Sequence, residues 1–466
     1  MRLWLRWWDV LRRLHPAFGR TRTFLWFSLC VAGLTVRPDL RGVTSVVRAL
    51  GLCEEFYDRL LDFFHSKAVH VDALARCWTY ALLSCCGSFL LRHNGRLVIL
   101  GDGIKTPKCG RKMPAVKKLH QESESNTKPS FIFGHSCQAI ALVAGFMETF
   151  FAVPLACRIH EGVVFSNRDT RTLLDKMMLL LRSVALNVPY YFVADAYYAC
   201  RITIRELLAQ GNHLVSRVKS NAVAYRPATH RKKRRGRRRV YGQKVRVRSL
   251  LDDVRSMHQA PSPLYGERNV LIRFRCTDLL WRPAGVLVRF VAVVHPHRGT
   301  MVLMSTDTTL APLDIIRLYG IRFKIEVSFK QAVHTVGAYA YHFWMADMTP
   351  RSRRSGNQYL HMKTDDYREK VRRKIRAYHC HLQCGLIAQG LLQYLSLSNS
   401  QLVWDTFGSW IRTIRPGVLP SECVVAIAMR HALPAFLADS SGDQTLAKFL
   451  RPMIDVERAE GYALAA

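Results

Sequence analysis

The sequence predicts a mixed α/β protein: a mixed sheet flanked by helices, interrupted by a strand-rich insertion, with helical regions at both ends. Two observations lead to this fold class. Apolar residues recur at three- and four-residue spacing over the first and last parts of the chain, as in helices that bury one face. Between these parts lie short apolar runs that end at glycine or charged residues, a pattern typical of buried strands. At 466 residues, the chain can form two to four structural units.

Five regions are expected in order along the chain. Residues 1–94 read as a helical domain and residues 95–219 as the first part of the α/β core. Residues 220–307 read as the strand-rich insertion, which contains a basic run. The core resumes over residues 308–400, and residues 401–466 form a helical C-terminal region.

The charge of the chain calls for a polyanionic partner. Lysine and arginine number 69 against 34 acidic residues, which gives a formal net charge of +35. Nucleic acid is the first candidate, and a membrane surface competes with it because the first 36 residues are rich in Trp, Leu and Arg. The apolar run from Phe24 to Val36 is too short to span a bilayer and is expected to be a buried core helix. No small-residue cleavage site follows this run, so a cytoplasmic protein is expected.

The thirteen cysteines are scattered singly, and no pair has CxxC spacing. The nearest approach to a metal cluster is "YHCHLQC", with His379, Cys380, His381 and Cys384. On a helix the two cysteines share a face while the two histidines point away, and tetrahedral zinc needs four converging ligands. Reduced, buried thiols are therefore expected in preference to zinc.

Two apolar runs each lead into an aspartate. The run Leu97 to Gly101 feeds into Asp102, and "YYFVA" feeds into Asp195. Each run is expected to be a buried strand that ends at its carboxylate. Taken singly, either aspartate could equally be a turn or capping residue.

A third carboxylate lies in "LYGIRFKIEVSFKQ", residues 318–331, which is expected to be one helix. Steps of four place Arg322, Glu326 and Lys330 on one face, and Tyr319 joins the same side. An ordinary stripe of surface ion pairs has the same spacing. Together with the two aspartates, however, Glu326 makes a set that can hold two divalent ions about 4 Å apart on a phosphodiester. Magnesium suits such an all-oxygen site.

These residues resemble the DDE transposases of bacterial insertion sequences, in the group with a tyrosine-arginine-glutamate-lysine signature. Tyr319, Arg322 and Glu326 match that signature in "YGIRFKIE", and Asp102 and Asp195 fall where the family places its first two aspartates. The resemblance implies a ribonuclease H-like core in which Asp102, Asp195 and Glu326 are catalytic and bind Mg²⁺, with Mn²⁺ as a substitute.

The resemblance also implies an activity and partners. Such an enzyme binds the terminal inverted repeats of its element through the helical region 1–94, cleaves DNA at the element ends and joins the 3′-hydroxyl ends to target DNA. The partners are then double-stranded DNA and a second copy of the chain, as a homodimer on paired ends. The expected location is the nucleoid of the bacterial cytoplasm, with no membrane association.

The chain departs from the family at one position. The family lysine comes seven residues after the glutamate, where this chain has Val333. Lys330 lies one helical turn after Glu326 and could supply the same charge, so Tyr319, Arg322 and Lys330 are expected to contact DNA. The alternative, in which Lys330 only pairs with Glu326 on the surface, stays open.

A basic run in the insertion is a second candidate DNA contact. A clamp on the DNA backbone and a solvated loop are both compatible with such a run; its cations are Arg231, Lys232, Lys233, Arg234, Arg235, Arg237, Arg238 and Arg239. Trp281 is expected to pack the insertion's own core rather than to stack on a base. His120 and His135 are expected to be structural, because two-metal phosphoryl transfer needs no histidine base.

Two other functions remain open: a ribonuclease H-like nuclease that cuts without joining, and a catalytically inactive DNA-binding descendant. Three carboxylates in the expected order disfavour the inactive descendant. A strand-transfer assay separates the nuclease from the transposase.

Overall fold

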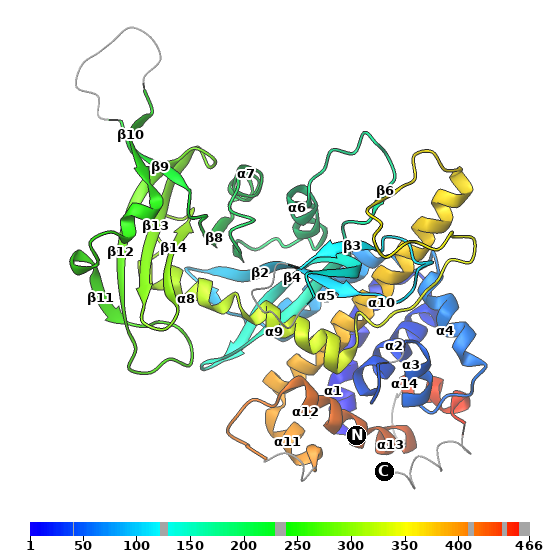
Figure 1. The fold of residues 1–466 in the computed structure, drawn as a ribbon. Helices are drawn as coiled ribbons and strands as arrows, with labels where there is room; N and C mark the ends of the chain where they lie inside the picture. Colours follow the sequence, from blue (N-terminus) through cyan, green and yellow to red (C-terminus); the bar gives the residue numbers. More distant parts are fainter. Residues whose placement is uncertain (41, 122–128, 229–238, 409–413, 440–444, 456–466) are drawn as a thin grey trace.

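The computed structural model describes residues 1–40, 42–121, 129–228, 239–408, 414–439 and 445–455. A large mixed sheet runs through the molecule, and helices flank it (Figure 1). The predicted fold class is therefore confirmed.

The central part of the sheet is formed by β2 (Arg96–Pro107), β4 (Phe131–Phe146), β5 (Thr149–Ile159), β7 (Tyr190–Ala194) and β8 (His213–Arg217). The spatial order is β5-β4-β2-β7-β8. The first three strands pair antiparallel, and β7 and β8 run parallel to β2. Three antiparallel strands followed by two parallel ones are the arrangement expected of a ribonuclease H-like core.

The central strands are buried because helices cover both faces of the sheet. All five residues of β7 are buried, as its unbroken apolar sequence predicts. α6 (Leu173–Ser183) leads into β7, and α7 (Arg201–Ala209) connects β7 to β8. A capping box at Thr172 and Asp175 begins α6, which fixes where the chain turns into the helix.

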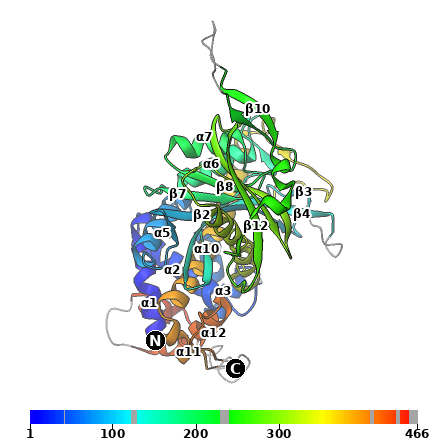
Figure 2. The ribbon, with the colours of Figure 1, turned by 90° about the vertical axis from the view of Figure 1, so that its left-hand side faces the viewer.

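The insertion contains the strands β9 (Val223–Pro227), β10 (Tyr241–Arg246), β11 (His258–Pro261), β12 (Leu271–Trp281), β13 (Val286–His295) and β14 (Gly299–Ser305). It continues the core sheet, because β14 pairs antiparallel with β8. Figures 1 and 2 show its strands standing beside the core. Trp281 is 5% exposed and meets Phe290 edge to face, so it packs the insertion's own core.

Helices at the two ends of the chain pack together below the sheet (Figures 1 and 2). The N-terminal elements are α1 (Arg2–Leu11), η1 (Arg12–Ala17), α2 (Thr21–Val36), α3 (Thr44–Ala49), α4 (Phe56–His65) and α5 (Val71–Cys85). The C-terminal ones are α10 (Asp365–Ser398), α11 (Ser400–Phe407), α12 (Glu422–His431), α13 (Leu433–Ala438), α14 (Thr445–Leu450) and η5 (Arg451–Met453). Trp4 shows the contact, since its ring stacks on Phe436 and its indole N–H donates to the Met429 carbonyl.

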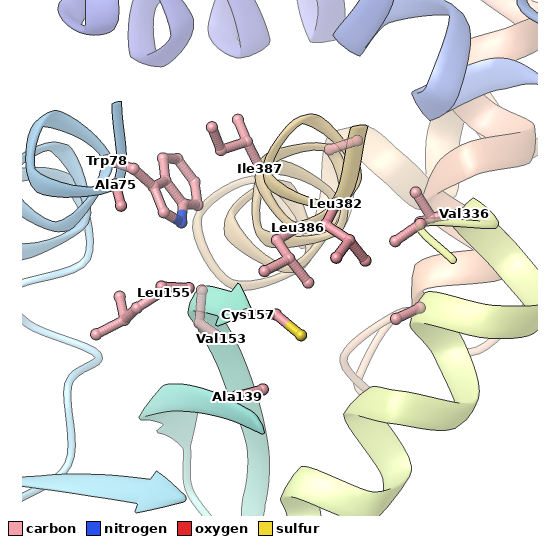
Figure 3. Close-up of a cluster of buried hydrophobic side chains, with 14 of the residues drawn as sticks. Ala75, Trp78, Ala139, Val153, Leu155, Cys157, Val336, Leu382, Leu386 and Ile387 are labelled. Carbon is pink, nitrogen blue, oxygen red and sulfur yellow. The ribbon is translucent and has the colours of Figure 1, made fainter. Parts of the chain in front are cut away.

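Short elements complete the fold: β1 (Arg92–His93), β3 (Lys117–His120), β6 (Val163–Val164), β15 (Gln358–Tyr359) and the 3₁₀ turns η2 (Val247–Leu251) and η3 (Val254–Ser256). The hydrophobic core lies where α10 crosses the sheet. Leu386 and Ile387 of α10 pack there between Trp78 of α5 and Leu155 of β5 (Figure 3). The Trp78 indole N–H also donates to the Pro154 carbonyl at 2.8 Å, which ties α5 to the strand.

The apolar run from Phe24 to Val36 lies in α2, where it is buried against α10 and α12 as expected of a core helix. Among the described residues, none of the helices combines the length and the apolar character needed to cross a bilayer.

Two expectations about local structure were wrong. β2 does not end at Asp102 but continues to Pro107, because β4 pairs with it along this whole stretch, with Asp102 opposite Ala139 and Pro107 opposite Gly134. The segment 318–331 is not one helix. It contains the end of α8 (Pro312–Ile321) and all of α9 (Lys324–Gln331), joined by a turn at Arg322 and Phe323.

The turn between α8 and α9 is made by shorter hydrogen-bonded loops than those of an α-helix. The amide of Arg322 donates to Tyr319, and the amide of Glu326 donates to Phe323, each to the third residue before it. After α9 the chain enters a π-helical turn, η4 (Ala332–Val336). Positions four and seven after Glu326 therefore do not continue one regular helical face, because the π turn shifts the register.

Candidate active site

Asp102 and Asp195 lie where two parallel strands separate. β2 and β7 pair from Leu97 opposite Tyr190 to Leu100 opposite Val193, and β7 ends at Ala194. Both aspartates follow directly after this paired stretch, so their side chains emerge at the same edge of the sheet. Asp195 Oδ1 accepts a hydrogen bond from the Tyr197 amide at 3.0 Å, which fixes the turn into α7.

Glu326 reaches the same edge from α9. Ile325 and Ser328 are buried, and they seat α9 against β5 and β2. The opposite face of the helix carries the exposed Glu326. Asp102, Asp195 and Glu326 all line one cavity of about 740 Å³. We call this the acidic cavity. The structure thus brings together three side chains separated by 93 and 131 residues in sequence.

Arg322 holds two of the three carboxylates. Its Nη1 lies 3.0 Å from Asp102 Oδ2, and its Nη2 lies 2.9 Å from Glu326 Oε1. The turn between α8 and α9 places Arg322 at this point. In the part of the chain that the structure describes, no three His, Cys, Asp or Glu side chains are grouped closely enough to hold one metal ion.

The electrostatics of Asp102 reflect its crowded position. Burial raises the pKa of its carboxyl to about 6, and the nearby charges of Asp195 and Glu326 act in the same direction. The Arg322 guanidinium and the Gly103 amide act in the opposite direction on this pKa. The Gly103 amide donates to Asp102 Oδ1 at 2.7 Å. A cation at this site therefore offsets the repulsion between neighbouring carboxylates.

The predicted DNA-contact residues of this segment occupy different environments. Tyr319 is largely buried on α8 with the Arg322 guanidinium 5.8 Å from its ring, and burial raises the pKa of its hydroxyl. Lys330 is exposed and forms no hydrogen bond or ion pair with another described residue. Glu326 pairs with Arg322 instead, so the surface pair between Lys330 and Glu326 is absent from the described residues.

Residues 231–238 of the basic run lie outside the described part of the chain. Arg239 is described. Its guanidinium donates to the carbonyls of Tyr241 and Gly242 at the start of β10.

Of the histidines singled out in the sequence, His135, His379 and His381 have structural partners, whereas His120 is exposed at the end of β3. His135 is fully buried between the Tyr341 hydroxyl and the Pro114 carbonyl. His379 Nε2 accepts the Ile159 amide, and His381 Nδ1 contacts the Ala338 carbonyl. Cys380 and Cys384 are buried.

The sequence did not reveal the basic wall of the acidic cavity. Lys105 of β2 and Lys117, Lys118 and His120 of β3 line it. Lys105 donates to the His120 carbonyl at 2.7 Å, and Lys117 pairs with Glu161 at 3.3 Å. The three lysines and His120 come from two strands that meet only through β4, and no sequence spacing signals such a meeting. Only the basic composition of residues 105–118 hinted at it.

Comparison with known proteins gives the family of the chain. Residues 13–265, more than half of the chain, match the family described as DDE superfamily endonuclease. The chain therefore belongs to the DDE superfamily endonucleases. The matched segment contains Asp102 and Asp195 and ends before Glu326.

No curated protein matches the chain. Among solved structures, a cryo-EM structure of the piggyBac transposase synaptic complex with hairpin DNA is similar. The similarity has a TM-score of 0.38 and 10% sequence identity, and it covers 93% of this chain and 76% of that chain.

Proposed function

We propose that the chain is an insertion-sequence transposase, which cleaves DNA at the ends of its element and joins the freed 3′-hydroxyls to target DNA. The observation that carries the proposal is the acidic cavity, where Asp102, Asp195 and Glu326 meet from three separate elements. Membership of an endonuclease superfamily supports DNA as the substrate. The net charge of +35 fits the same polyanion.

Endonucleases of this superfamily generally use divalent metal ions, and the donor set here fits Mg²⁺ or Mn²⁺. Asp102, Asp195 and Glu326 offer carboxylate oxygens, which Mg²⁺ prefers, and the open cavity leaves room for water ligands. These three residues would share a pair of ions between them rather than surround one ion, since among the described residues no three such side chains are grouped around a single ion position. Bound there, a pair of ions activates the attacking oxygen and stabilises the leaving oxygen of a phosphodiester.

Arg322 has two roles in this proposal. In the structure it neutralises Asp102 and Glu326. Its guanidinium would also donate to a DNA phosphate bound in the cavity, for which its planar fork is well suited. Lys330, exposed one turn beyond Glu326, supplies a second cation to the same strand.

The DNA contacts extend beyond the cavity. Lys105 and Lys118 on its wall contact the backbone near the cut, and the basic run that includes Arg239 acts as a clamp on the backbone. The helical region 1–94 recognises the terminal inverted repeats, and α1 and η1 expose arginines to solvent for such contacts. A homodimer holds the two element ends.

A strand-transfer assay tests the proposal directly. Pre-cut element ends with a free 3′-hydroxyl are incubated with the protein, Mg²⁺ and a supercoiled plasmid. Joined products that require the 3′-hydroxyl are the expected result. Cleavage of uncut ends without any joining would identify a nuclease instead, and binding without cleavage or joining would identify an inactive descendant. Either outcome would overturn the proposal.

A further inference from the structure

A second cavity lies beside the acidic cavity and has the opposite charge. Its volume is about 690 Å³, and three arginines and three histidines line it: Arg76, Arg158, Arg376, His70, His160 and His379. We call it the arginine cavity. Asp72 is its one acidic lining residue, which leaves a formal charge of +2 with the histidines neutral.

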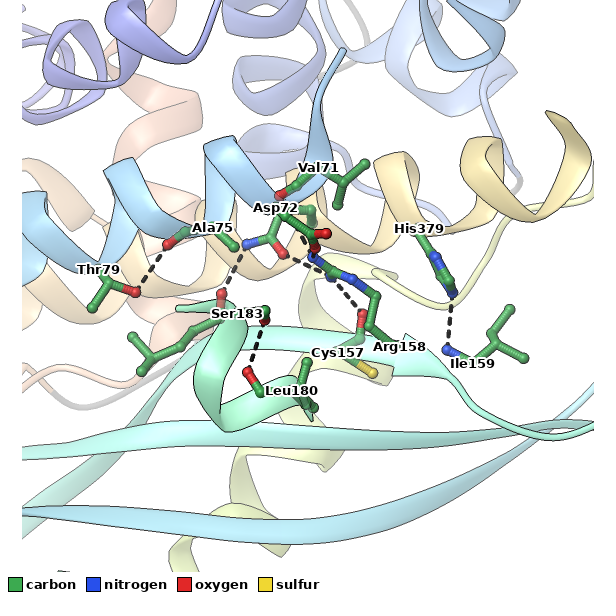
Figure 4. Close-up of polar contacts among 12 residues, drawn as sticks. Val71, Asp72, Ala75, Thr79, Cys157, Arg158, Ile159, Leu180, Ser183 and His379 are labelled. Atoms are coloured by element: carbon green, nitrogen blue, oxygen red, sulfur yellow. Dashed lines mark hydrogen bonds and ion pairs between the residues drawn. The ribbon is translucent and has the colours of Figure 1, made fainter. Parts of the chain in front are cut away.

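The arginines come from three different elements, so their convergence is a property of the fold. Arg158 projects from β5 toward the first residues of α5, and His379 of α10 contacts Ile159 beside it (Figure 4). The guanidinium of Arg158 is fixed by hydrogen bonds to Asp72 at 2.9 Å and Gln383 at 3.2 Å. Arg76 and Arg376 are exposed at the rim, where Arg376 pairs with Glu369 at 2.9 Å.

The start of α5 adds to the positive potential of the cavity. Val71, Asp72 and Ala73 line it, and no side chain caps this 15-residue helix. The first amides of a helix carry partial positive charge and bind anions. Burial, together with the nearby Lys176 and Arg158, lowers the pKa of His160 to about 3, so this imidazole is neutral and the guanidiniums supply the charge.

The two cavities share a wall. Leu173 at the start of α6 lines the acidic cavity, and Ser183 at its end lines the arginine cavity. The cavities adjoin at this wall, since His160 lines the arginine cavity and the next residue, Glu161, lines the acidic cavity. Inside the wall, His160 Nδ1 lies 2.5 Å from Gln138 Oε1, and Gln138 donates to the Tyr198 hydroxyl at 3.0 Å.

We propose that the arginine cavity binds a backbone phosphate of the DNA duplex beside the phosphodiester held in the acidic cavity. This inference rests on the proposed function, because it takes the acidic cavity as the place of cleavage. Guanidinium groups bind phosphate oxygens in pairs, and a helix start contributes amide donors to the same anion. Phosphate binding here anchors the duplex beyond the cut and carries no sequence information.

The test is a salt titration of DNA binding in EDTA, where no metal-dependent chemistry occurs. The variant is Arg76→Gln with Arg376→Gln, both at the exposed rim, and the matched control is Arg255→Gln with Arg268→Gln in the insertion. Each protein is titrated with a duplex that stops at the cleavage site and with duplexes extended by about fifteen base pairs on either side. Unfolding midpoints confirm that all variants are folded.

The expected result is specific to one extended duplex. For that duplex, the slope of log affinity against log salt should become shallower by about 0.9 in the double variant, the change expected for one phosphate that is no longer neutralised. The duplex that stops at the cleavage site should keep its wild-type slope, and the control pair should not distinguish the duplexes. An equal fall in slope on all duplexes, or an unchanged slope on every duplex, would overturn the inference.

A second experiment distinguishes DNA from a free anion as the ligand of the arginine cavity. Inorganic phosphate is added to wild type and to the double variant in a thermal unfolding assay. If phosphate stabilised the wild type alone and the DNA titrations were unchanged, the cavity would be a site for free phosphate, which overturns the DNA assignment. Because binding is measured without metal, the result is independent of whether the strand-transfer assay succeeds.

Discussion

At the scale of single residues, Arg322 determines how the carboxylates of the acidic cavity are paired. Its guanidinium binds Asp102 and Glu326 at the same time. Removing one partner of such a part-buried set leaves a charge uncompensated, which costs more than the pair contributes. The sequence placed this arginine beside Glu326 but could not show that it also reaches Asp102, because that ion pair joins positions 220 residues apart.

Lys330 offers the first prediction. Its exposed ammonium has no partner among the described residues, so Lys330→Ala should remove a DNA contact without loosening the fold. The loss of a charge-assisted hydrogen bond costs about 1.5 to 3 kcal/mol, so cleavage of a labelled element end should fall on the order of ten- to a hundredfold. Lys448→Ala, on the exposed side of α14, is the matched control. A change below about twofold in Lys330→Ala would show that it does not contact the DNA.

Restoring the family lysine should not rescue that loss. Val333 is partly buried against the core and lies in the π turn after α9, so Val333→Lys would bury an ammonium or displace the turn. On a regular helix, positions 330 and 333 would both face the side of Glu326, but the π turn that begins at Ala332 changes this register.

Gly101 offers a prediction about the strand that carries Asp102. A methyl group at this position would lie 2.3 Å from the ring of Phe192, which is fully buried. Gly101→Ala should therefore lower the free energy of unfolding by about 1–3 kcal/mol in urea denaturation. Gly103→Ala is the control on the same strand, because its methyl group would meet the Cys137 carbonyl at an ordinary 3.6 Å. Equal stability of the two variants would contradict this packing.

At the scale of elements, the sequence predicted the helices and strands that follow from a local pattern of residues. The apolar run "YYFVA" predicted β7 with its correct ends, and the apolar run from Phe24 to Val36 predicted the buried helix α2. The prediction failed where pairing or packing with a distant segment determines the structure. The second half of β2 is polar on average and is a strand because β4 pairs with it. Before the turn between α8 and α9 lies one poor helix former, Gly320, but a single glycine is tolerated within a helical pattern and does not by itself predict a break.

The residues of the candidate site also differ in whether a local sequence pattern could identify them. The three carboxylates could be named from their neighbours in sequence, because each follows or lies in a strong motif. The basic wall of the acidic cavity and the whole arginine cavity could not be identified from the sequence. Arg76, Arg158 and Arg376 are ordinary arginines in sequence, and only the packing of α5, β5 and α10 brings them to one cavity.

A buried arginine connects the N-terminal helices to the segment that follows Glu326. Arg37, after α2, donates to the carbonyls of Val336 and Gly337 at the end of η4 and to Ser45 Oγ. Arg37→Lys cannot make this set of bonds and should leave buried acceptors unpaired, at a cost of about 1–3 kcal/mol for each. Urea denaturation should show this destabilisation.

The control for this prediction is Arg48→Lys. Arg48 makes one exposed ion pair, with Asp39, so its replacement should change stability by less than about 1 kcal/mol. Similar midpoints for Arg37→Lys and Arg48→Lys would show that Arg37 does not hold the helices together.

At the scale of the whole molecule, buried histidines make stability depend on pH. Burial lowers the pKa of His135 and of His381 to about 3, and the neighbouring Lys108 acts in the same direction on both; for His381 the larger electrostatic contribution comes from Arg37. In the unfolded chain an imidazole has a pKa of about 6.5. The unfolded state therefore binds more protons below that pH, and stability should fall as pH decreases from about 6.5.

Each such histidine contributes a slope of at most about 1.4 kcal/mol per pH unit. His381→Asn keeps a donor for the Ala338 carbonyl and should flatten the dependence by about one proton. His15→Asn is the control, because His15 is exposed to water in the folded state. Urea midpoints between about pH 7 and pH 5 measure the slope. An unchanged slope in His381→Asn would contradict its neutral, buried state.

The central claim is that Asp102, Asp195 and Glu326 act together in cleavage. The most direct measurement compares cleavage and binding of an element end by wild type and by Asp102→Asn, Asp195→Asn and Glu326→Gln. Glu161→Gln is the matched control, since Glu161 lines the same cavity but pairs with Lys117. Each of the three variants should lose on the order of a thousandfold or more in cleavage while binding changes little, because the cations supply the affinity. Cleavage within a few-fold of wild type in any one of them would contradict the claim.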